Sequence, residues 1–552
     1  MNVSNSIVAM LESVGVDAVF SGSGQGSGDI LFAFAESKKI KTIMVRHEQA
    51  ASFMACGYAM FNKGKLGVCN AQGGPGSYNF FSGLGVALSD SLPVLSIASY
   101  SPKKWRGKGD LGEVTGLGRT PDSQAMFAAT TKGTFLIEHP DQACDIVEEA
   151  INLAFEGRPG PVHIDLPYDV AAMPATRHRE IKLDIKPILP LKKTVDLFAS
   201  VLADAMNAKK KILAIIGYGS VRSHAEKELL QFVEKFQIPF LTSMDAKGII
   251  PENHPLSLGM PGTCGDKSAK EAFKAAEVVI GIGNSFPKWQ MWKFEEGLFD
   301  NKTLMHINIS RDEIGKVYPT DYGMISDIAP AIKALDEALA LKKPLVEKKT
   351  YTKDKIYNSV VKAKGSKVHP GALCQELSKL LPDRAIVLGD AGANMIWLAA
   401  FMEFNKGQNF KNPGSFGPMA SHVNASLGVQ LANPDRRVIV GCGDGDYEMS
   451  GFEILTALQN KIPIIWVILN NSEFNIIKLF NLAAHGKEVF NHIICPDFAK
   501  YAEACGANGF RVEKLEQFAD AFKNALASDK PSIIDVIIDA DEVMPFKTWV
   551  QD

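Results

Sequence analysis

Two apolar segments that end in polar residues constrain the fold of this chain most. Residues 438–443 run into Asp444 between two glycines, and residues 462–469 end in Asn470 and Asn471, which is 471 − 444 = 27 residues after Asp444. One helix-length segment, about 451–460, lies between the two. This order predicts a βαβ unit with both polar ends at the carboxyl edge of a parallel sheet, where α/β folds bind ligands.

The residue types at these strand ends suit a divalent cation and a diphosphate. Mg²⁺ takes oxygen ligands and commonly shares them between protein side chains and phosphate groups. Asp444 and Asn471 are therefore candidate metal ligands. Gly443 and Gly445 have no side chain, so the backbone at these positions can approach a phosphate closely.

Two other interpretations concern the glycine-rich turns. A calcium loop beginning at Asp444 is excluded, because Met449 and Leu455 stand where such a loop needs a glycine and a glutamate. A dinucleotide-binding turn over residues 21–28 stays open: the segment follows an apolar strand, opens a helix and precedes Glu48 by 48 − 28 = 20 residues. Its glycines do not have the Gly-x-Gly-x-x-Gly spacing.

Composition and length narrow the class of protein. A chain of 552 residues predicts roughly three or four domains. The charge of −3, from 59 basic and 62 acidic residues, gives no electrostatic case for nucleic acid or acidic membranes. The eight cysteines are scattered without a Cys-x-x-Cys pair, which indicates reduced thiols in a cytoplasmic protein. No secretory signal and no apolar stretch of about 18 residues is present, so we expect no membrane span.

The alternation of short apolar strands and helical patterns divides the chain into three parts. We expect domains over 1–172, 190–340 and 356–552, the last with a C-terminal tail, separated by polar, lysine- and proline-bearing connectors. Because strands and helices alternate, the fold class is α/β, and each domain is expected to be a parallel sheet flanked by helices.

Several motifs occur together and in a fixed order. Residues 46–51 read Arg-His-Glu-Gln-Ala-Ala, residues 72–77 contain a Gly-Pro-Gly turn, and residues 157–167 read Gly-Arg-Pro-Gly-Pro-Val-His-Ile-Asp-Leu-Pro. With the Gly-Asp-Gly and Asn-Asn pattern, this series resembles the thiamine diphosphate-dependent family of acetohydroxyacid synthases, pyruvate oxidases and 2-oxo acid decarboxylases. The resemblance implies a pyrimidine-binding first domain, a Rossmann-like central domain and a diphosphate-binding third domain. It also implies a homodimer or homotetramer in which thiamine diphosphate and Mg²⁺ bind between subunits.

The resemblance assigns roles to individual residues. Glu48 is expected to hydrogen-bond N1′ of the aminopyrimidine and to promote loss of the C2 proton, which works best for a partly desolvated carboxyl group. Gln25 would line the donor side, Met419 would support the bent cofactor, and His422 is either a proton carrier or a packing residue. The expected metal ligands are the side chains of Asp444 and Asn471 and the carbonyl of Glu473. The expected cofactor-binding residues are Glu48, Gly74, Gly392, Ala393, Asn394, Gly417, Met419, Gly443, Asp444, Gly445, Asp446, Asn471 and Phe474.

The expected reaction is decarboxylation of a 2-oxo acid and transfer of the acyl unit to an aldehyde or ketone, as in acetolactate synthases. Phe480 stands where those enzymes carry a tryptophan, which argues against acetolactate synthesis for branched amino acids. Residues 284–288 lack the arginine of FAD-binding relatives, so we expect no catalytic FAD and leave a structural nucleotide open. The alternatives are a C–C lyase acting on a 2-hydroxy ketone or on a 2-hydroxyacyl- or oxalyl-CoA substrate, and a non-catalytic nucleotide-binding regulator.

Overall fold

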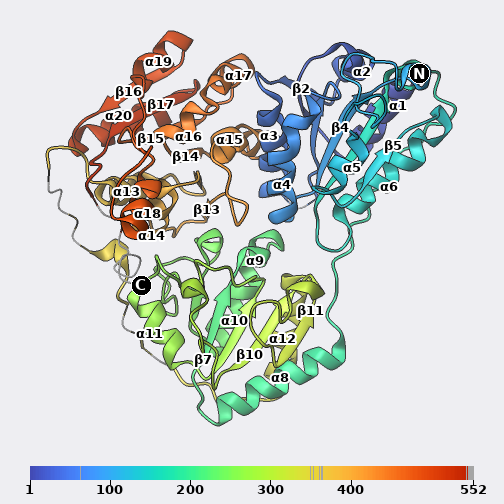
Figure 1. Cartoon of the computed structure of the whole chain (residues 1–552). Coiled ribbons are helices and arrows are strands. Elements are labelled where there is room, and N and C mark those ends of the chain that lie inside the picture. Colours follow the sequence, from blue (N-terminus) through green and yellow to red (C-terminus); the bar gives the residue numbers. More distant parts are fainter. Residues whose placement is uncertain are drawn as a thin grey trace.

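Three lobes, each built on a parallel β-sheet, make up the computed structural model of the chain (Figure 1). The structure describes residues 1–544 except 63, 349, 352, 360, 362–364 and 543. Residues 545–552, at the end of the expected C-terminal tail, lie outside the described residues. Three parallel sheets with helices on their faces confirm the α/β fold class, whereas the exact domain limits of 1–172, 190–340 and 356–552 stay predictions.

The first sheet has six strands in the order β2-β1-β3-β4-β6-β5, all of them parallel. Its strands are β1 (Ala18–Ser21), β2 (Lys41–Met44), β3 (Gly67–Ala71), β4 (Val94–Tyr100), β5 (Thr134–Leu136) and β6 (Pro161–Pro167). Its helices are α1 (Val3–Ser13), α2 (Gly28–Glu36), α3 (Glu48–Met60), α4 (Phe81–Ser89), α5 (Ser123–Ala128), α6 (Ala143–Phe155) and α7 (Tyr168–Ala172).

The central sheet has five parallel strands in the order β11-β10-β9-β7-β8. Its strands are β7 (Ile212–Ile216), β8 (Phe240–Thr242), β9 (Val278–Ile282), β10 (Thr303–Asn308) and β11 (Tyr322–Ile325). Its helices are α8 (Lys192–Asn207), α9 (Tyr218–Arg222), α10 (Glu226–Phe236), α11 (Lys267–Ala275) and α12 (Ile328–Leu341).

The third sheet has six parallel strands in the order β13-β12-β14-β15-β17-β16. Its strands are β12 (Ile386–Gly389), β13 (Asn409–Lys411), β14 (Val438–Gly443), β15 (Ile465–Asn470), β16 (Asn508–Val512) and β17 (Ser532–Ile537). Its helices are α13 (Pro370–Leu380), α14 (Ala393–Phe401), α15 (Ser421–Ala432), α16 (Asp444–Glu448), α17 (Ile454–Asn460), α18 (Asn475–His485), α19 (Phe498–Cys505) and α20 (Phe518–Leu526).

The βαβ unit that the sequence predicts is confirmed in the third sheet. β14 and β15 are adjacent and parallel, with Gly443 opposite Leu469, and α17 lies between them in sequence. Both strands are apolar and buried, as expected for a sheet covered on both faces. β15 begins at Ile465 and not at residue 462, because Pro463 has no N–H to donate to the ladder.

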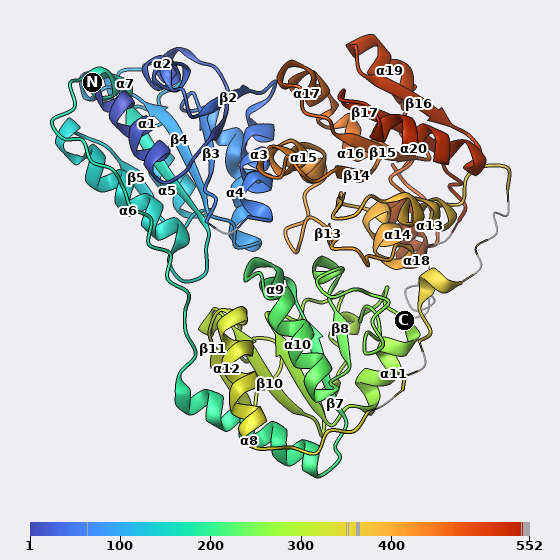
Figure 2. The ribbon, with the colours of Figure 1, turned by 180° about the vertical axis from the view of Figure 1, so that it is seen from behind.

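Helices α3 and α15 join the first and third domains (Figures 1 and 2). Every residue of α3 from Ala50 to Met60 is buried. Gly57 lies against the backbone of Ala425, and Gly428 lies against the backbone of Met54, so a Cβ at either glycine would overlap main-chain atoms. Two glycines thus allow the two helix backbones to come into direct contact.

Candidate active site

Asp444 organises the turn that follows β15. Its Oδ2 accepts hydrogen bonds from the backbone amides of Asn471 at 3.0 Å and Ser472 at 2.6 Å, and its Oδ1 accepts one from Gly445 at 2.8 Å. The side chain is almost fully buried. The two expected metal-binding residues, separated by 27 positions in the sequence, are therefore neighbours in the fold.

Two further carboxylates lie buried close to Asp444. Asp446 accepts a hydrogen bond from the Gly443 amide at 2.8 Å, and Asp390 accepts hydrogen bonds from the amides of Ala391, His422 and Val423 at 2.7–2.8 Å. Burial raises the pKa of Asp390 to about 6. Burial and the nearby charge of Asp390 raise the pKa of Asp446 well above its ordinary value, and burial raises that of Asp444 as well. Such a cluster of desolvated carboxylates favours a bound cation.

The N-terminus of α14 lies beside this cluster. Gly392 precedes the helix with φ +115°, a conformation that favours glycine, and no side chain caps the first N–H groups of the helix. Asn394 donates from Nδ2 to the carbonyls of Asp390 at 2.8 Å and Gly441 at 3.3 Å. The free amides at a helix start attract an anion, so Gly392, Ala393 and Asn394 are suited to a diphosphate.

Met419, Phe474 and Gly445 meet at the same sheet edge. A Cβ on Gly445 would lie 3.3 Å from Met419 Cε and would overlap the Phe474 ring. Gly417, with φ +62°, lies two residues before Met419 in an exposed turn. The structure thus brings three expected cofactor-binding residues together and leaves room only for glycine at position 445.

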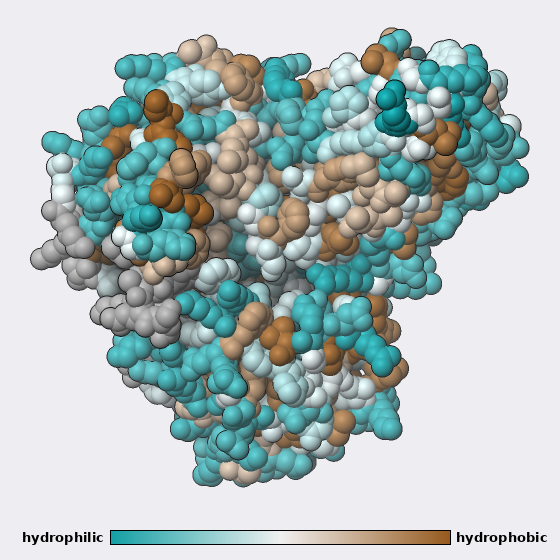
Figure 3. All heavy atoms as spheres, in the orientation of Figure 1, coloured by the Kyte–Doolittle hydropathy of each residue, from teal (hydrophilic) through white to brown (hydrophobic). Residues whose placement is uncertain are grey.

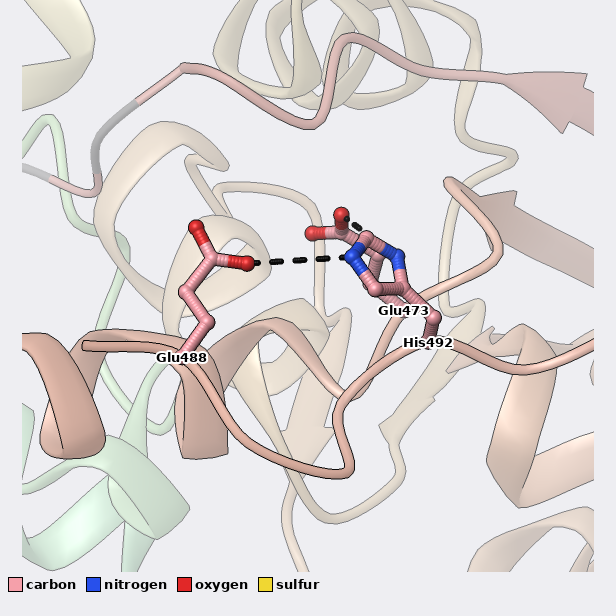
Figure 4. Close-up of side chains that lie close together, drawn as sticks. All are labelled: Glu473, Glu488 and His492. Atoms are coloured by element: carbon pink, nitrogen blue, oxygen red, sulfur yellow. Dashed lines mark ion pairs between the residues drawn. The ribbon is translucent and has the colours of Figure 1, made fainter.

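The segment after Asn471 is held by an ion-pair cluster (Figure 4). Asn471 Oδ1 accepts a hydrogen bond from the Glu473 amide at 3.2 Å. The Glu473 carboxylate pairs with Lys478 at 3.0 Å and with His492 Nδ1 at 3.2 Å, and His492 Nε2 lies 3.8 Å from Glu488. Because Lys478 already supplies a cation here, the cluster serves to fix the strand-end turn.

A second group of expected residues lies at the carboxyl edge of the first sheet. Glu48 is the first residue of α3, and its Oε2 accepts a hydrogen bond from Asn79 Nδ2 at 3.1 Å. A Cβ on Gly22 would lie 2.6 Å from Glu48 Cγ, so the strand end packs directly on this side chain. The glutamate is therefore held in a defined position and only half-buried.

Gln72 contacts the glycines on both sides of Gln25 in the sequence, and Gly74 follows Gln72 by two residues. Gln25 is exposed, while the amide of the following Gly26 donates to Gln72 Oε1. Gly74, with φ +72°, lies against the backbone of Gly112. Glu48 and Gln72 fill the space beside Gly22 and Gly24, and this packing accounts for the glycines at 22 and 24 without a dinucleotide.

His422 lies inside the third domain. Its side chain has an exposed fraction of 0%, and its Nδ1 lies 2.9 Å from the Gly389 carbonyl. Burial lowers the pKa of His422 to about 3, so the ring is neutral at physiological pH. This environment is that of a packing histidine.

A cavity of about 970 Å³ lies where the three domains meet. It is bordered by Gly392 and Gly417 of the third domain, by Phe480 of α18, and by residues of the other two domains. Among the described residues that line it, none is Glu48, Gln25 or Gly74. Within one chain, the two groups of expected site residues therefore do not border the same cavity.

Three contributors to the site were not predicted from the sequence. Asp390 belongs to the buried acidic cluster, Asn79 orients Glu48, and Gln72 holds the turn before α2. Asp390 directly follows a buried strand, so the strand-end pattern that identified Asp444 could have identified it too. The same holds for Gln72, which directly follows the buried strand β3, whereas Asn79 carries no such signal, because its contact depends on a distant segment.

Comparison with known proteins gives the class of this chain. Residues 1–125 match the family described as "Thiamine pyrophosphate enzyme, N-terminal TPP binding domain". Residues 199–335 match the central domain of these enzymes and residues 390–536 their C-terminal TPP binding domain. The chain therefore belongs to the thiamine pyrophosphate enzymes and is a thiamine diphosphate-dependent enzyme of the carboligase and decarboxylase class.

Individual relatives are similar over almost their whole length. The chain is 30% identical to a "Probable acetolactate synthase large subunit" of Methanocaldococcus jannaschii, covering 99% of this chain and 93% of that protein. It is 29% identical to the "Acetolactate synthase large subunit" of Lactococcus lactis, covering 98% and 93%. It is 28% identical to the "Putative thiamine pyrophosphate-containing protein YdaP" of Bacillus subtilis, covering 98% and 92%.

Membrane-spanning helices are not found in the part of the chain that the structure describes: none of its helices combines the length and the apolar character that crossing a bilayer requires.

Proposed function

We propose that this enzyme uses thiamine diphosphate and Mg²⁺ to decarboxylate a 2-oxo acid and to transfer the acyl unit to an aldehyde or ketone. The observation that carries the proposal is the buried cluster of Asp390, Asp444 and Asp446 beside the uncapped start of α14. Two relatives that carry the name acetolactate synthase also support the proposal.

The residues at the third-sheet edge fit a magnesium diphosphate. Asp446 Oδ1 is buried and has no hydrogen-bond partner among the described residues, so it is free to face a cation or its water. Burial raises the pKa of all three carboxylates, so a bound cation would stabilise their ionised forms. Asp444, Asn471 and the Glu473 carbonyl would hold the metal, and Gly392, Ala393 and Asn394 would hold the diphosphate.

Bound thiamine diphosphate supplies a nucleophilic carbon that takes up a carbonyl carbon and accepts the electron pair left when CO₂ departs. Glu48 would hold the proton shared with the aminopyrimidine ring, and Asn79 orients its carboxylate. Gly74, Gly417, Met419 and Phe474 would contact the rings of the cofactor. His422 would pack beneath the site as a neutral ring, because it is fully buried and burial lowers its pKa.

A second copy of the chain is part of the proposal. Glu48 and Asp444 lie at the carboxyl edges of different sheets, and the cavity beside Gly392 does not include Glu48. α18 has no fully buried residue, and Phe490 and Ile494 beyond it are 99% and 97% exposed. Figure 3 shows hydrophobic groups on the surface of that lobe. Exposed apolar surface of this kind marks an interface, so we infer a homodimer or homotetramer with sites between subunits.

The choice of substrate rests on the cavity. Phe480 and Ile476 of α18 border it and would contact the donor or the acceptor. A second candidate function keeps the cofactor but cleaves a C–C bond in a 2-hydroxy ketone or in a 2-hydroxyacyl- or oxalyl-CoA substrate. The cavity volume of about 970 Å³ favours this candidate, because such a cavity admits a large ligand. Catalytic FAD is not part of either proposal, and a cytoplasmic location stays a prediction.

Two measurements test the proposal. Calorimetry with thiamine diphosphate, with and without Mg²⁺, should show binding that requires the metal. A panel of 2-oxo acids, 2-hydroxy ketones and acyl-CoA thioesters, with CO₂ release and product analysis, should then show CO₂ and a coupled product from a 2-oxo acid. Cleavage without CO₂ release, or CO₂ release only from oxalyl-CoA, would favour the second candidate. Binding of thiamine diphosphate without any turnover would contradict both.

A further inference from the structure

A buried lysine connects all three domains beside the central cavity. Lys411 is the last residue of β13, and its side chain has an exposed fraction of 0%. Its Nζ lies 2.8 Å from Asp90 Oδ2 of the first domain and 3.3 Å from Asp245 Oδ2 of the central domain. The ammonium group also lies 4.7 Å from the centre of the Tyr218 ring, another central-domain residue. One cation of the third domain therefore meets one carboxylate from each of the other two.

The charges of this triad depend on one another. Burial alone lowers the pKa of Lys411, but the attraction of Asp245 and Asp90 outweighs it, and the pKa is raised above the ordinary value. Burial raises the pKa of Asp245, and Lys411 opposes that rise. Removing the cation would leave two carboxylates in a desolvated place without a partner, which is strongly destabilising. Both ion pairs of the triad therefore form only when the three domains pack together as in this structure.

The same two carboxylates hold the segment that follows Lys411. The amide of Asn412 donates to Asp245 Oδ1 at 2.9 Å, and Asn412 Oδ1 accepts the Gly414 amide at 2.9 Å. Gly414, with φ +66°, lies so close to Asp90 that a Cβ there would overlap the carboxylate. Further along, the Phe416 ring packs on Gly85 of α4, where a Cβ would lie 2.6 Å from Cζ. Residues 412–416 are thus attached to both other domains.

We propose that Lys411 is a positioning residue for thiamine diphosphate, because its ion pairs with Asp90 and Asp245 fix the loop over 412–419 against the cofactor site. The loop ends in Gly417 and Met419, and Met419 reaches Gly445 in the third domain. This inference rests on the proposed function, which places Gly417 and Met419 at the aminopyrimidine. Lys411 itself does not touch the cofactor and acts through the loop.

The test compares Lys411→Met with a triple variant that also carries Asp90→Asn and Asp245→Asn. Lys411→Met keeps the length of the side chain but leaves two unpaired carboxylates, so we expect a lower thermal midpoint and a dissociation constant for thiamine diphosphate raised about tenfold or more. The triple variant has no buried carboxylate without a cation, so its thermal midpoint should return toward that of the wild type. Its affinity for thiamine diphosphate should stay reduced, because the two ion pairs that fix the loop are then absent. Lys411→Arg, which keeps the charge, should restore much of the affinity.

Hydrogen exchange supplies a readout that does not depend on turnover. In the cofactor-free wild type, the amides of Asn412 and Gly414 should be protected, and they should exchange faster in the triple variant. Lys379→Met is the matched control, since Lys379 is 71% exposed and pairs with Glu376 at 3.1 Å; it should leave exchange and affinity unchanged. Wild-type affinity in the triple variant, or rapid exchange of both amides in the wild type, would overturn the inference. A wild type that fails to bind thiamine diphosphate would instead overturn the proposed function.

Discussion

The carboxylate of Asp444 accepts a hydrogen bond from the backbone amide of Asn471 at 3.0 Å. The contact joins the segments that follow β14 and β15, so the two expected ligands lie side by side without a metal. The burial that makes this geometry rigid also raises the pKa of Asp444. The geometry of the turn is thus set by backbone hydrogen bonds, and the proposed cation would balance its charge.

The first prediction concerns Glu48. Glu48→Gln keeps the size of the side chain and the contact with Asn79, so thiamine diphosphate should still bind in calorimetry. Turnover should fall by about 10²–10⁴-fold, because the variant cannot exchange the proton that the activating group must hold. Glu36→Gln, on the exposed C-terminal turn of α2, is the control. Full activity in Glu48→Gln would remove Glu48 from its proposed role.

A mixing experiment tests whether sites form between subunits. Glu48→Gln and Asp444→Asn should each be nearly inactive alone. If each site combines Glu48 of one subunit with Asp444 of the other, random mixed dimers carry one intact site, and activity should recover to about a quarter of the wild type. The subunits are mixed after mild dissociation, and wild type treated in the same way is the control. Mixtures that stay inactive although heterodimers form would show that each site uses one chain.

Gly428 tests the contact between α3 and α15. A Cβ at this position would overlap the Met54 carbonyl and lie 2.9 Å from the Tyr58 amide nitrogen, so Gly428→Ala must push two helix backbones apart. We expect a loss of stability of about 1–3 kcal/mol or more, measured by thermal or urea unfolding. Gly28→Ala is the matched control: the residue is helical with φ −52° and has nothing within 4 Å of its Cβ position. It should stabilise by up to about 1 kcal/mol.

We expect the acidic cluster to make the free energy of unfolding depend on pH and on Mg²⁺. The pKa of Asp390 is about 6 in the folded protein and about 4 when unfolded, so between these values the folded state binds more protons. Without metal, the contribution of Asp390 to the free energy of unfolding is fully present below about pH 4. It is lost as the pH rises toward 6. Mg²⁺ binds ionised carboxylates, so its stabilising effect should grow from pH 5 to pH 7. If Mg²⁺ shifts the thermal midpoint equally at pH 5 and pH 7, the acidic cluster is not the metal site.

Parts of the site could be predicted because they depend on local sequence. An apolar strand that runs into glycine and aspartate identifies Asp444, and the next strand identifies Asn471, since neighbouring parallel strands end at the same edge. Asn79 and Lys411 could not be predicted this way. Asn79 reaches Glu48 across 31 residues, and Lys411 reaches Asp90 across 411 − 90 = 321 residues. Their partners are set by how helices and domains pack.

The amino-acid sequence by itself determined the alternation of strands and helices, the strand-end positions of Asp444 and Asn471, and the family. These properties follow from hydrophobic periodicity and from turn residues, which act over a few positions. Only the tertiary structure decided that Asp390 and Asp446 are buried together, that His422 is enclosed and neutral, and that Lys411 joins three domains. Burial and charge pairing are properties of surfaces brought together from distant segments, so no short stretch of sequence contains them.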